Sequence, residues 1–120
     1  MLIGIDSLES VRVETLINNN KFLSKCFTAY EAAYLSTRPS RTLSLAGLFC
    51  AKESFLKALG IGVLNGIELN EVEVRHRESG KPYLNLSDNA KSKMLELGVS
   101  NSEISITHTH TLSSAICILY

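Results

Sequence analysis

Residues 49–57 read FCAKESFLK and lie within a longer stretch whose apolar residues recur at helical spacing. From residue 41 to residue 59 the chain contains no proline and a single glycine, and Gly60 follows as a natural helix end. The pattern predicts the longest helix of the protein over 41–59. Because apolar residues point in almost every direction around this helix, we expect it to be covered and central.

Lys52, Glu53 and Lys57 interrupt this apolar helix. Successive helical residues turn by about 100°, so Glu53 and Lys57 share one face while Lys52 is displaced to the side. For an arbitrary helix, the usual interpretation would be a surface ion pair worth about 0.2–0.5 kcal/mol. A covered carboxylate, however, is costly unless a cation or hydrogen bonds compensate for its charge. The apolar surroundings therefore favour a functional site.

Asp6 raises the same question, because it follows the apolar run at residues 2–5 that predicts a first strand. Taken alone, Asp6 could be a polar strand end or a helix cap. Together with Glu53 and a lysine, it suggests a site for a phosphate and a hard divalent ion. Mg²⁺ is typically held by one or two carboxylates, waters and phosphate oxygens.

The rest of the chain predicts an α+β domain. Thr28 and Glu31 match a capping box at a helix start, Ser7 or Ser10 could cap the first helix, and Ser87 or Asp88 the last. The order implies a single domain over residues 1–120, with a largely antiparallel sheet packed on the long helix. The predicted strands cover 2–5, 71–77, 83–86, 104–107 and 115–119, and the predicted helices cover 11–17, 29–36, 41–59 and 88–97.

Composition limits the classes of function. The chain has 120 residues, 45% of them hydrophobic, which fits one small domain that could bury more surface by self-association. Basic and acidic residues number 12 each, so net charge does not favour nucleic acid or a membrane surface. Three scattered cysteines, Cys26, Cys50 and Cys117, indicate reduced thiols. Without a signal peptide or an apolar run of roughly 18 residues, a cytoplasmic protein is expected.

The order of these motifs resembles a known family. Gly4-Ile5-Asp6 is followed about forty residues later by LAGLFCAKESFLKALGIG over 45–62. This pattern resembles the 4'-phosphopantetheinyl transferases, specifically the short holo-[acyl-carrier-protein] synthase type. The similarity continues through Phe27-Thr28-x-x-Glu31, the 80–82 turn and the 105–108 strand, so it covers nearly the whole chain. It implies the 4'-phosphopantetheinyl transferase fold, present as a single half-unit.

The resemblance also implies a reaction. Enzymes of this type move 4'-phosphopantetheine from coenzyme A to a serine of an apo acyl carrier protein and release adenosine 3',5'-bisphosphate. By the same resemblance, Asp6 and Glu53 are expected to bind Mg²⁺, and Lys57 is expected to contact the phosphate that gains charge. Either Glu53 or a metal-bound water could accept the serine proton. Lys52 is expected to reach another phosphate or a structural partner.

Other residues are expected at the coenzyme A cleft. Lys81, Pro82 and His108 match family positions there. His108 and His110 would share one face of the 104–107 strand region, but a zinc site is not favoured because no third ligand stands at a suitable spacing. Leu48 stands where an arginine is common, so coenzyme A affinity could be reduced or Lys81 could compensate.

Acidic carrier proteins call for a local basic surface, and the resemblance assigns Arg12, Lys21 and Lys25 to it. Larger relatives contain two such half-units with the site between them, so a homotrimer with sites between subunits is expected. The alternative is a catalytically inactive relative that binds coenzyme A or a carrier protein, which the joint presence of the site residues disfavours. The resemblance suggests fatty acid biosynthesis and lipid metabolism, but it leaves open a polyketide or other carrier and the acyl state of the coenzyme A.

Overall fold

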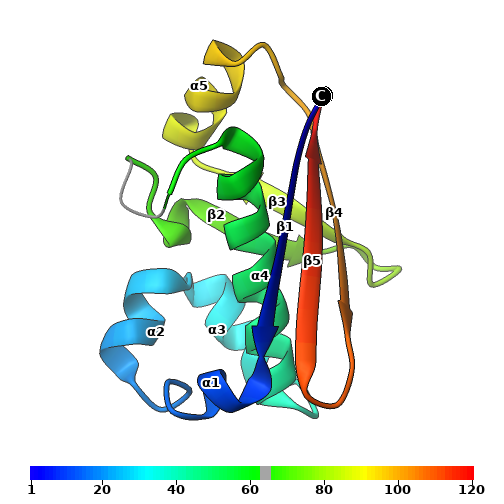
Figure 1. The fold of residues 1–120 in the computed structure, drawn as a ribbon. Helices are drawn as coiled ribbons and strands as arrows, with labels where there is room; N and C mark the ends of the chain where they lie inside the picture. Colours follow the sequence, from blue (N-terminus) through cyan, green and yellow to red (C-terminus); the bar gives the residue numbers. More distant parts are fainter. Residues whose placement is uncertain (63–65) are drawn as a thin grey trace.

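A computed structural model describes residues 1–62 and 66–120, and its central element is the long helix α4. A three-stranded sheet lies along one side of α4, and a separate hairpin, β2–β3, lies on another side (Figure 1). The elements in chain order are β1 (Leu2–Glu9), α1 (Ser10–Glu14), α2 (Asn20–Cys26), α3 (Ala29–Ser36), α4 (Arg41–Leu59), the 3-10 turn η1 (Leu69–Glu71), β2 (Val72–His76), β3 (Pro82–Leu86), α5 (Asp88–Glu96), β4 (Ser102–His108) and β5 (Leu112–Leu119).

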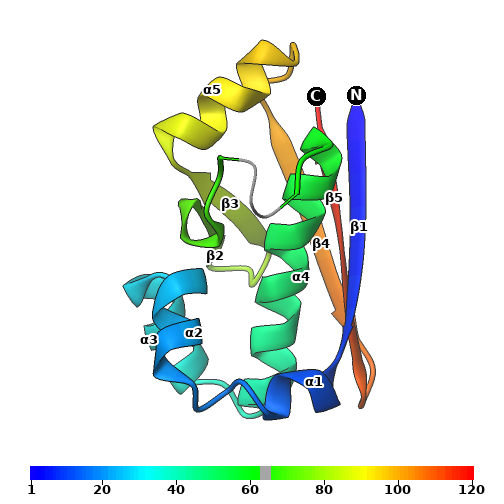
Figure 2. The same cartoon turned by 60° about the vertical axis from the view of Figure 1, so that its left-hand side comes forward.

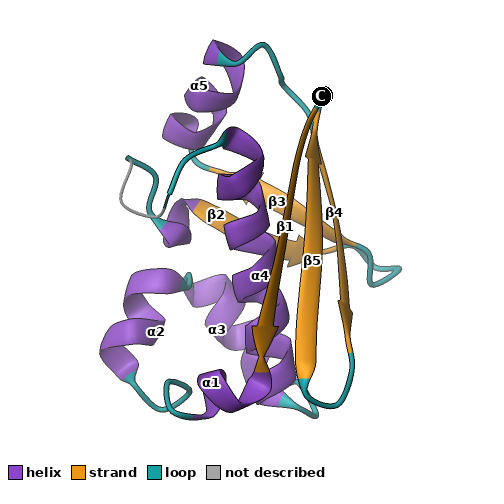
Figure 3. Cartoon of the chain, in the orientation of Figure 1, coloured by secondary structure: helices purple, strands orange, loops and turns teal. Residues whose placement is uncertain are grey.

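The small helices gather at the two ends of the molecule. In the turned view of Figure 2, α1, α2 and α3 lie together around the N-terminal part of α4, whereas α5 lies near its C-terminal end. The same separation is visible in Figure 3, where the strands of the main sheet run along one side of α4. This arrangement leaves the middle of α4 between β1 and the hairpin, which is where FCAKESFLK lies.

Helix α4 confirms the prediction for the long helix. It begins at Arg41 and ends at Leu59, and Gly60 closes it in the left-handed conformation, with a φ of 76°. Only glycine adopts that conformation without strain, which explains why the helix ends there. Most of the residues of α4 are buried, as expected for a helix that is apolar on nearly all sides.

The main sheet has the order β1-β5-β4, and both pairings are antiparallel. Its first strand approaches α4 very closely at Gly4. A Cβ atom at this position would lie 2.0 Å from the backbone oxygen of Ser54 and 2.5 Å from the backbone nitrogen of Ala58. Asp6 is two residues further on, so its side chain leaves β1 on the same side as this contact. The glycine therefore lets β1 bring Asp6 against the helix.

Several predictions need correction. The expected sheet is divided, because in the described part of the chain β2 and β3 pair only with each other. β1 continues past the apolar run to Glu9, because β5 pairs with it along its whole length. Ser7 consequently lies inside the strand, and Glu9 rather than Ser10 precedes α1, without a side-chain cap. The proposed Ser7 and Ser10 caps are therefore wrong.

Helix α2 is absent from the predicted elements, because the asparagine run at residues 18–20 indicates a helix end. The side-chain oxygen of Asn19 accepts a hydrogen bond from the backbone nitrogen of Phe22, so the same asparagine run also starts a helix. The caps predicted at Thr28 and Ser87 are confirmed. β4 ends at His108, and His110 lies in the following turn, so these histidines do not share a strand face.

The core lies between α4, the main sheet and the hairpin. Cys26, Cys50 and Cys117 are all buried and free, as expected. Within the two described ranges, none of the helices is both long enough and apolar enough to cross a lipid bilayer.

Candidate active site

Asp6 and Lys57 form an ion pair where β1 passes α4. The Nζ atom of Lys57 lies 2.8 Å from Oδ1 of Asp6, and the side chains are 52% and 14% exposed, respectively. The hydrogen bond to Asp6 raises the pKa of Lys57, so the ammonium stays charged. This pair is open to solvent on the lysine side, and a phosphate could reach it there.

Glu53 is partly buried beside this pair. Burial raises the pKa of Glu53, the negative charge of Asp6 raises it further, and Lys57 opposes both effects. Within residues 1–62 and 66–120, no ion pair joins Glu53 to Lys57, so the simple pair suggested by their spacing does not form. The site holds two carboxylates against one ammonium.

The chemistry of this donor set fits Mg²⁺. Two carboxylates can anchor the ion while waters and substrate oxygens complete its coordination. In the described part of the chain, no group of three or more His, Cys, Asp or Glu side chains could enclose a metal. A closed structural zinc site would require four protein ligands, so Asp6 and Glu53 suit an open, substrate-completed site.

Cys50 lies about one turn before Glu53 on α4, close to the Asp6–Lys57 pair. Burial raises its pKa to about 12, and the charge of Asp6 contributes in the same direction. Since the thiolate is the nucleophilic form of cysteine, Cys50 is an inert core residue and not a nucleophile.

Lys52 points away from this site into the protein. Its Nζ atom donates to Oε1 of Glu31 at 2.6 Å and to the backbone oxygens of Leu69 and Val72, each at 3.0 Å. Both members of the Lys52–Glu31 pair are fully buried. Burial lowers the pKa of Lys52, and Glu31 counteracts this effect. Of the two expectations for Lys52, the structural partner is correct, because an enclosed ammonium cannot reach a phosphate.

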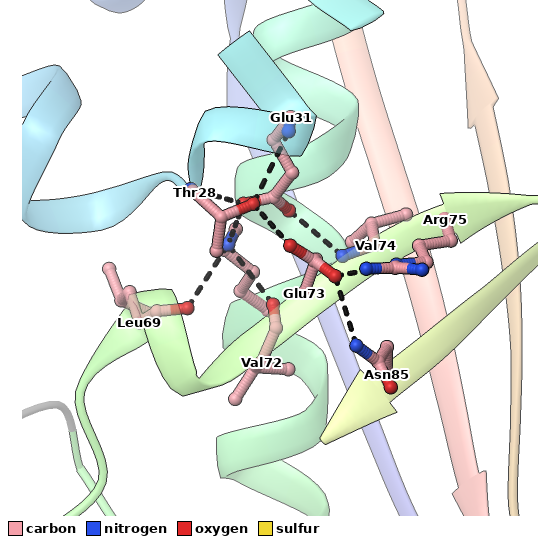
Figure 4. Close-up of polar contacts among 9 residues, drawn as sticks. Thr28, Glu31, Leu69, Val72, Glu73, Val74, Arg75 and Asn85 are labelled. Carbon is pink, nitrogen blue, oxygen red and sulfur yellow. Dashed lines mark hydrogen bonds and ion pairs between the residues drawn. The ribbon is translucent and has the colours of Figure 1, made fainter. Parts of the chain in front are cut away.

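Glu31 completes the connection between α3, α4 and β2 (Figure 4). Its Oε1 atom also accepts from the backbone nitrogen of Thr28 at 2.9 Å, and its Oε2 atom accepts from that of Val74 at 2.8 Å. Thr28 donates in turn to Glu73, which also accepts from Arg75 and from Asn85 on β3. The network holds the hairpin on the helix that carries Glu53.

Pro82 and His108, both expected at the coenzyme A cleft, line one cavity. It has a volume of about 180 Å³ and lies between α3, α4, the hairpin and β4. Leu48 forms part of its apolar wall and is 2% exposed. Lys81 does not line the cavity and instead forms an ion pair with Glu103 at 3.2 Å. The other lining residues are Tyr34, Ser44, Gly47, His76, Gly80 and Ile106.

Arg12 lies at a different place, beside an apolar hollow of about 530 Å³ between α1, α2 and α4. Lys21 and Lys25 are exposed on α2, and Lys21 precedes Phe22, which lines the same hollow. Among the described residues, none of these three cations takes part in an ion pair. The hollow is lined by Leu8, Val11, Arg12, Val13, Thr15, Leu16, Phe22, Leu45 and Phe49.

Comparison with known proteins identifies the family of this chain. The sequence model described as the 4'-phosphopantetheinyl transferase superfamily matches residues 2–116. The chain belongs to this superfamily. It is 40% identical to the holo-[acyl-carrier-protein] synthase of Treponema denticola, over 98% of this chain and 95% of that one. The synthase of Halothermothrix orenii is 36% identical, over 97% and 94%. The chain is therefore an enzyme of the holo-[acyl-carrier-protein] synthase type.

Solved structures of such synthases share the fold. The crystal structure from Neisseria meningitidis has a TM-score of 0.89 at 23% identity, covering 100% of this chain and 99% of that chain. The Bacillus anthracis synthase, described in complex with CoA (3',5'-ADP), has a TM-score of 0.82 at 29% identity, covering 98% and 94%. The predicted α+β fold of the phosphopantetheinyl transferases is confirmed.

The expected metal-binding, catalytic and coenzyme A-binding residues of this transferase lie mainly in two places. Asp6, Glu53 and Lys57 lie together where β1 meets α4. Pro82 and His108 meet at the cavity, with Lys81 outside it. His76 and Tyr34 also line that cavity but were not identified from the sequence. The one local signal for His76 is the hairpin, whose register places it opposite Pro82.

Proposed function

We propose that this enzyme transfers 4'-phosphopantetheine from coenzyme A to a serine of an apo acyl carrier protein, in a Mg²⁺-dependent reaction. The observation that carries the proposal is the convergence of Asp6, Glu53 and Lys57, which come from two elements far apart in sequence. Two carboxylates and a half-exposed ammonium suit a metal-bound diphosphate. A protein that only binds a carrier has no need of this combination.

In the proposed reaction, the serine oxygen attacks the phosphorus that bears the pantetheine arm. A new P–O bond forms to serine, the bond to the other phosphate breaks, and adenosine 3',5'-bisphosphate leaves with the electron pair. Mg²⁺ held by Asp6 and Glu53 would neutralise the diphosphate. Lys57 stabilises the charge that develops on the leaving phosphate, because its ammonium is open to solvent and is charged at neutral pH.

The serine proton requires an acceptor. Glu53 is one candidate, because it lies partly buried beside Asp6 and Lys57 in the proposed site. A water molecule in the site is the other candidate.

We assign the nucleotide part of coenzyme A to the cavity lined by Pro82 and His108. The related Bacillus anthracis synthase forms a complex with CoA (3',5'-ADP), which supports the choice of ligand. Lys81 remains a proposed phosphate contact. Its pair with Glu103 is about half exposed on both sides, and such pairs are worth about 0–1 kcal/mol, so a phosphate can replace the carboxylate.

The acidic carrier protein is proposed to dock on Arg12, Lys21 and Lys25. The apolar hollow beside Arg12 supports this assignment, because stable interfaces combine an apolar centre with charged groups at the rim. Replacing Arg12 and Lys21 with glutamate should weaken carrier binding and leave coenzyme A binding unchanged. An equal loss of both affinities would contradict the assignment.

We further propose a homotrimer with sites between subunits. Ile3 and Ile5 are 61% and 64% exposed on the outer face of β1, and they pair with Ile118 and Ile116 of β5. A contiguous apolar face of this kind is typical of an interface. Light scattering should give the trimer mass for the wild type, and Ile5→Glu should reduce it. A monomeric wild type would contradict this assembly.

Mass spectrometry tests the reaction itself. The protein is mixed with a panel of apo carrier proteins from fatty-acid and polyketide systems, with coenzyme A, and with either Mg²⁺ or EDTA. A phosphopantetheine mass increment in the Mg²⁺ samples alone is expected, and the panel identifies the carrier class. Binding without an increment for any carrier would favour the inactive relative.

Three free buried thiols support a reducing, cytoplasmic location.

A further inference from the structure

Strand β1 runs beside α4 (Figure 1), and Gly4 is the point at which the two backbones come into contact. The two α4 atoms closest to a Cβ atom at this position are the backbone oxygen of Ser54, at 2.0 Å, and the backbone nitrogen of Ala58, at 2.5 Å. These atoms have the spacing of one helical hydrogen bond, so neither can turn aside as a flexible side chain could. Because real Cβ contacts do not fall below 3.0 Å, any side chain here must move β1 about 1 Å away from α4.

The contact lies at the level of the candidate metal ligands. On α4, Glu53 directly precedes Ser54. On β1, Asp6 is two residues beyond Gly4 and therefore leaves the strand on the same face. Burial raises the pKa of Glu53 and the charge of Asp6 raises it further, as expected for neighbouring carboxylates. The distance between strand and helix at Gly4 therefore sets the separation of the two carboxylates.

Strand β1 cannot move at Gly4 without carrying Asp6 with it. β5 pairs with β1 along its whole length, with Gly4 opposite Cys117 and Asp6 opposite Ala115. Both of these partners are buried in the core beneath the sheet. Since close-packed interiors transmit strain, a displacement at position 4 is passed on to the carboxylate two residues away.

The ion that suits two carboxylates depends on their separation. Mg²⁺ requires oxygens at about 2.0–2.1 Å in near-ideal octahedral geometry, whereas Ca²⁺ accepts them at about 2.3–2.6 Å in flexible geometry. An ion held between a strand and a helix makes one bond to each side, so Ca²⁺ can bridge a gap up to about 1 Å wider. This is about the opening that a side chain at position 4 would impose.

We propose that Gly4 is a positioning residue that fixes the separation of Asp6 and Glu53, and that this separation makes the site prefer Mg²⁺ over Ca²⁺. The inference rests on the proposed function, because it takes these two carboxylates as the metal ligands. It adds the choice of metal, which depends on a contact between two backbones and not on the ligands alone.

Titrations with MgCl₂ or CaCl₂ alone, followed by nuclear magnetic resonance, measure both dissociation constants on the folded protein. The wild type should bind Mg²⁺ more tightly than Ca²⁺. Gly4→Ala should weaken Mg²⁺ binding by about 10-fold or more, as is usual when the support of a metal ligand is lost, and weaken Ca²⁺ binding far less. Adding Asp6→Glu to this variant lengthens the strand carboxylate and should restore part of the Mg²⁺ affinity. A purely structural role of Gly4 would give neither the change of preference nor the rescue.

Met94→Ala is the matched control for lost stability. Met94 is a core residue of α5 and lies outside the candidate site. Its truncation should lower the unfolding temperature and leave both metal dissociation constants unchanged. If Gly4→Ala weakens the binding of both ions equally, or of neither, the inference is overturned and the proposed function stands.

If Gly4→Ala does not fold, Asp6→Glu alone makes the test. At the native separation the longer carboxylate reaches too far, so Mg²⁺ binding should weaken by about 10-fold, and an unchanged affinity would overturn the inference. A wild type that binds Ca²⁺ as tightly as Mg²⁺ would also overturn it. A wild type that binds neither ion but modifies a carrier protein overturns the inference alone. If it binds neither ion and modifies no carrier, the proposed function fails as well.

Discussion

Helix α4 carries two lysine–carboxylate pairs, and their surroundings differ sharply. Lys52 and Glu31 lie 2.6 Å apart with no exposed side-chain surface on either partner. Lys57 and Asp6 lie 2.8 Å apart with 52% and 14% of their side chains exposed. The two lysines share one sequence motif and similar distances to their carboxylates, so burial is what separates them.

The difference decides the role of each pair. The hydrogen bonds of the buried pair are all made to atoms of the protein, and they join α4 to α3, η1 and β2. The open pair makes one hydrogen bond and stands beside a second carboxylate, Glu53, whose charge is poorly compensated. The pKa values of Lys52 and Lys57 shift in opposite directions for this reason. The Lys52–Glu31 pair, whose hydrogen-bonding groups are all occupied, stabilises the structure. The Lys57–Asp6 pair has hydrogen-bonding groups left over and can bind metal and phosphate.

Breaking the buried pair should have the largest effect. Lys52→Met leaves the carboxylate of Glu31 buried without its cation, and such losses cost about 3–5 kcal/mol of unfolding free energy. Urea unfolding at a fixed protein concentration measures the change. Adding Glu31→Gln removes the uncompensated charge and should recover part of the loss. A change below about 1 kcal/mol, as is usual for surface pairs, would contradict the structural role.

Removing the second carboxylate of the open site should affect activity and not stability. Glu53→Gln keeps the shape of the side chain but loses the charge that would anchor Mg²⁺. Transfer should fall by about 10²–10³-fold, the usual cost of losing a charge-stabilising group. Holo-carrier formation followed by mass spectrometry gives the rate, and thermal unfolding confirms the fold. Unimpaired turnover would refute Glu53 as a metal ligand.

Replacing Lys57, the lysine of the exposed pair, by a neutral residue should affect activity where the replacement of Lys52 affects stability. Lys57→Met should reduce kcat/KM by about 100-fold because the leaving phosphate loses its cation. The unfolding free energy should change by less than about 1 kcal/mol, since Lys57 is half exposed. Lys57→Arg keeps the charge and should restore part of the rate. Loss of stability without loss of rate would reverse the assignment.

The smallest effect is expected from alkaline pH. The hydrogen bond to Asp6 raises the pKa of Lys57 above 10.5. A cation whose pKa is higher in the folded state contributes its full stability below the unfolded value and loses it as the pH rises through the folded value. On the alkaline side, the small stability difference between wild type and Lys57→Met should therefore be constant from neutral pH up to about 10.5 and shrink above that value. A difference that grows with pH would contradict the pairing with Asp6.

Local signals in the sequence predicted part of this structure well. Gly60, the capping box at Thr28 and the cap at Ser87 act within one helical turn, so their helices could be identified without tertiary information. The helical period also placed Glu53 and Lys57 on one face. Helix α2 was missed because the asparagines before it both end one segment and cap the next.

Tertiary pairings could not be predicted in the same way. Helical geometry says which residues share a face, but it does not say that Asp6 takes Lys57 as its partner or that Glu31 encloses Lys52. The division of the sheet depends on how β2 and β3 lie relative to β4, and no local pattern encodes that relation. His76 gives no motif at all, although it lines the same cavity as Pro82 and His108.

The most direct test measures kcat/KM and unfolding free energy together on Lys52→Met and Lys57→Met, at a temperature where both variants are folded. The account predicts opposite patterns: Lys57→Met loses transfer activity and keeps its stability, and Lys52→Met loses stability by a far larger margin than its rate falls. If both variants lose rate and stability to the same extent, the two pairs have the same role. That result would contradict the assignment of phosphopantetheine transfer to the Lys57–Asp6 pair.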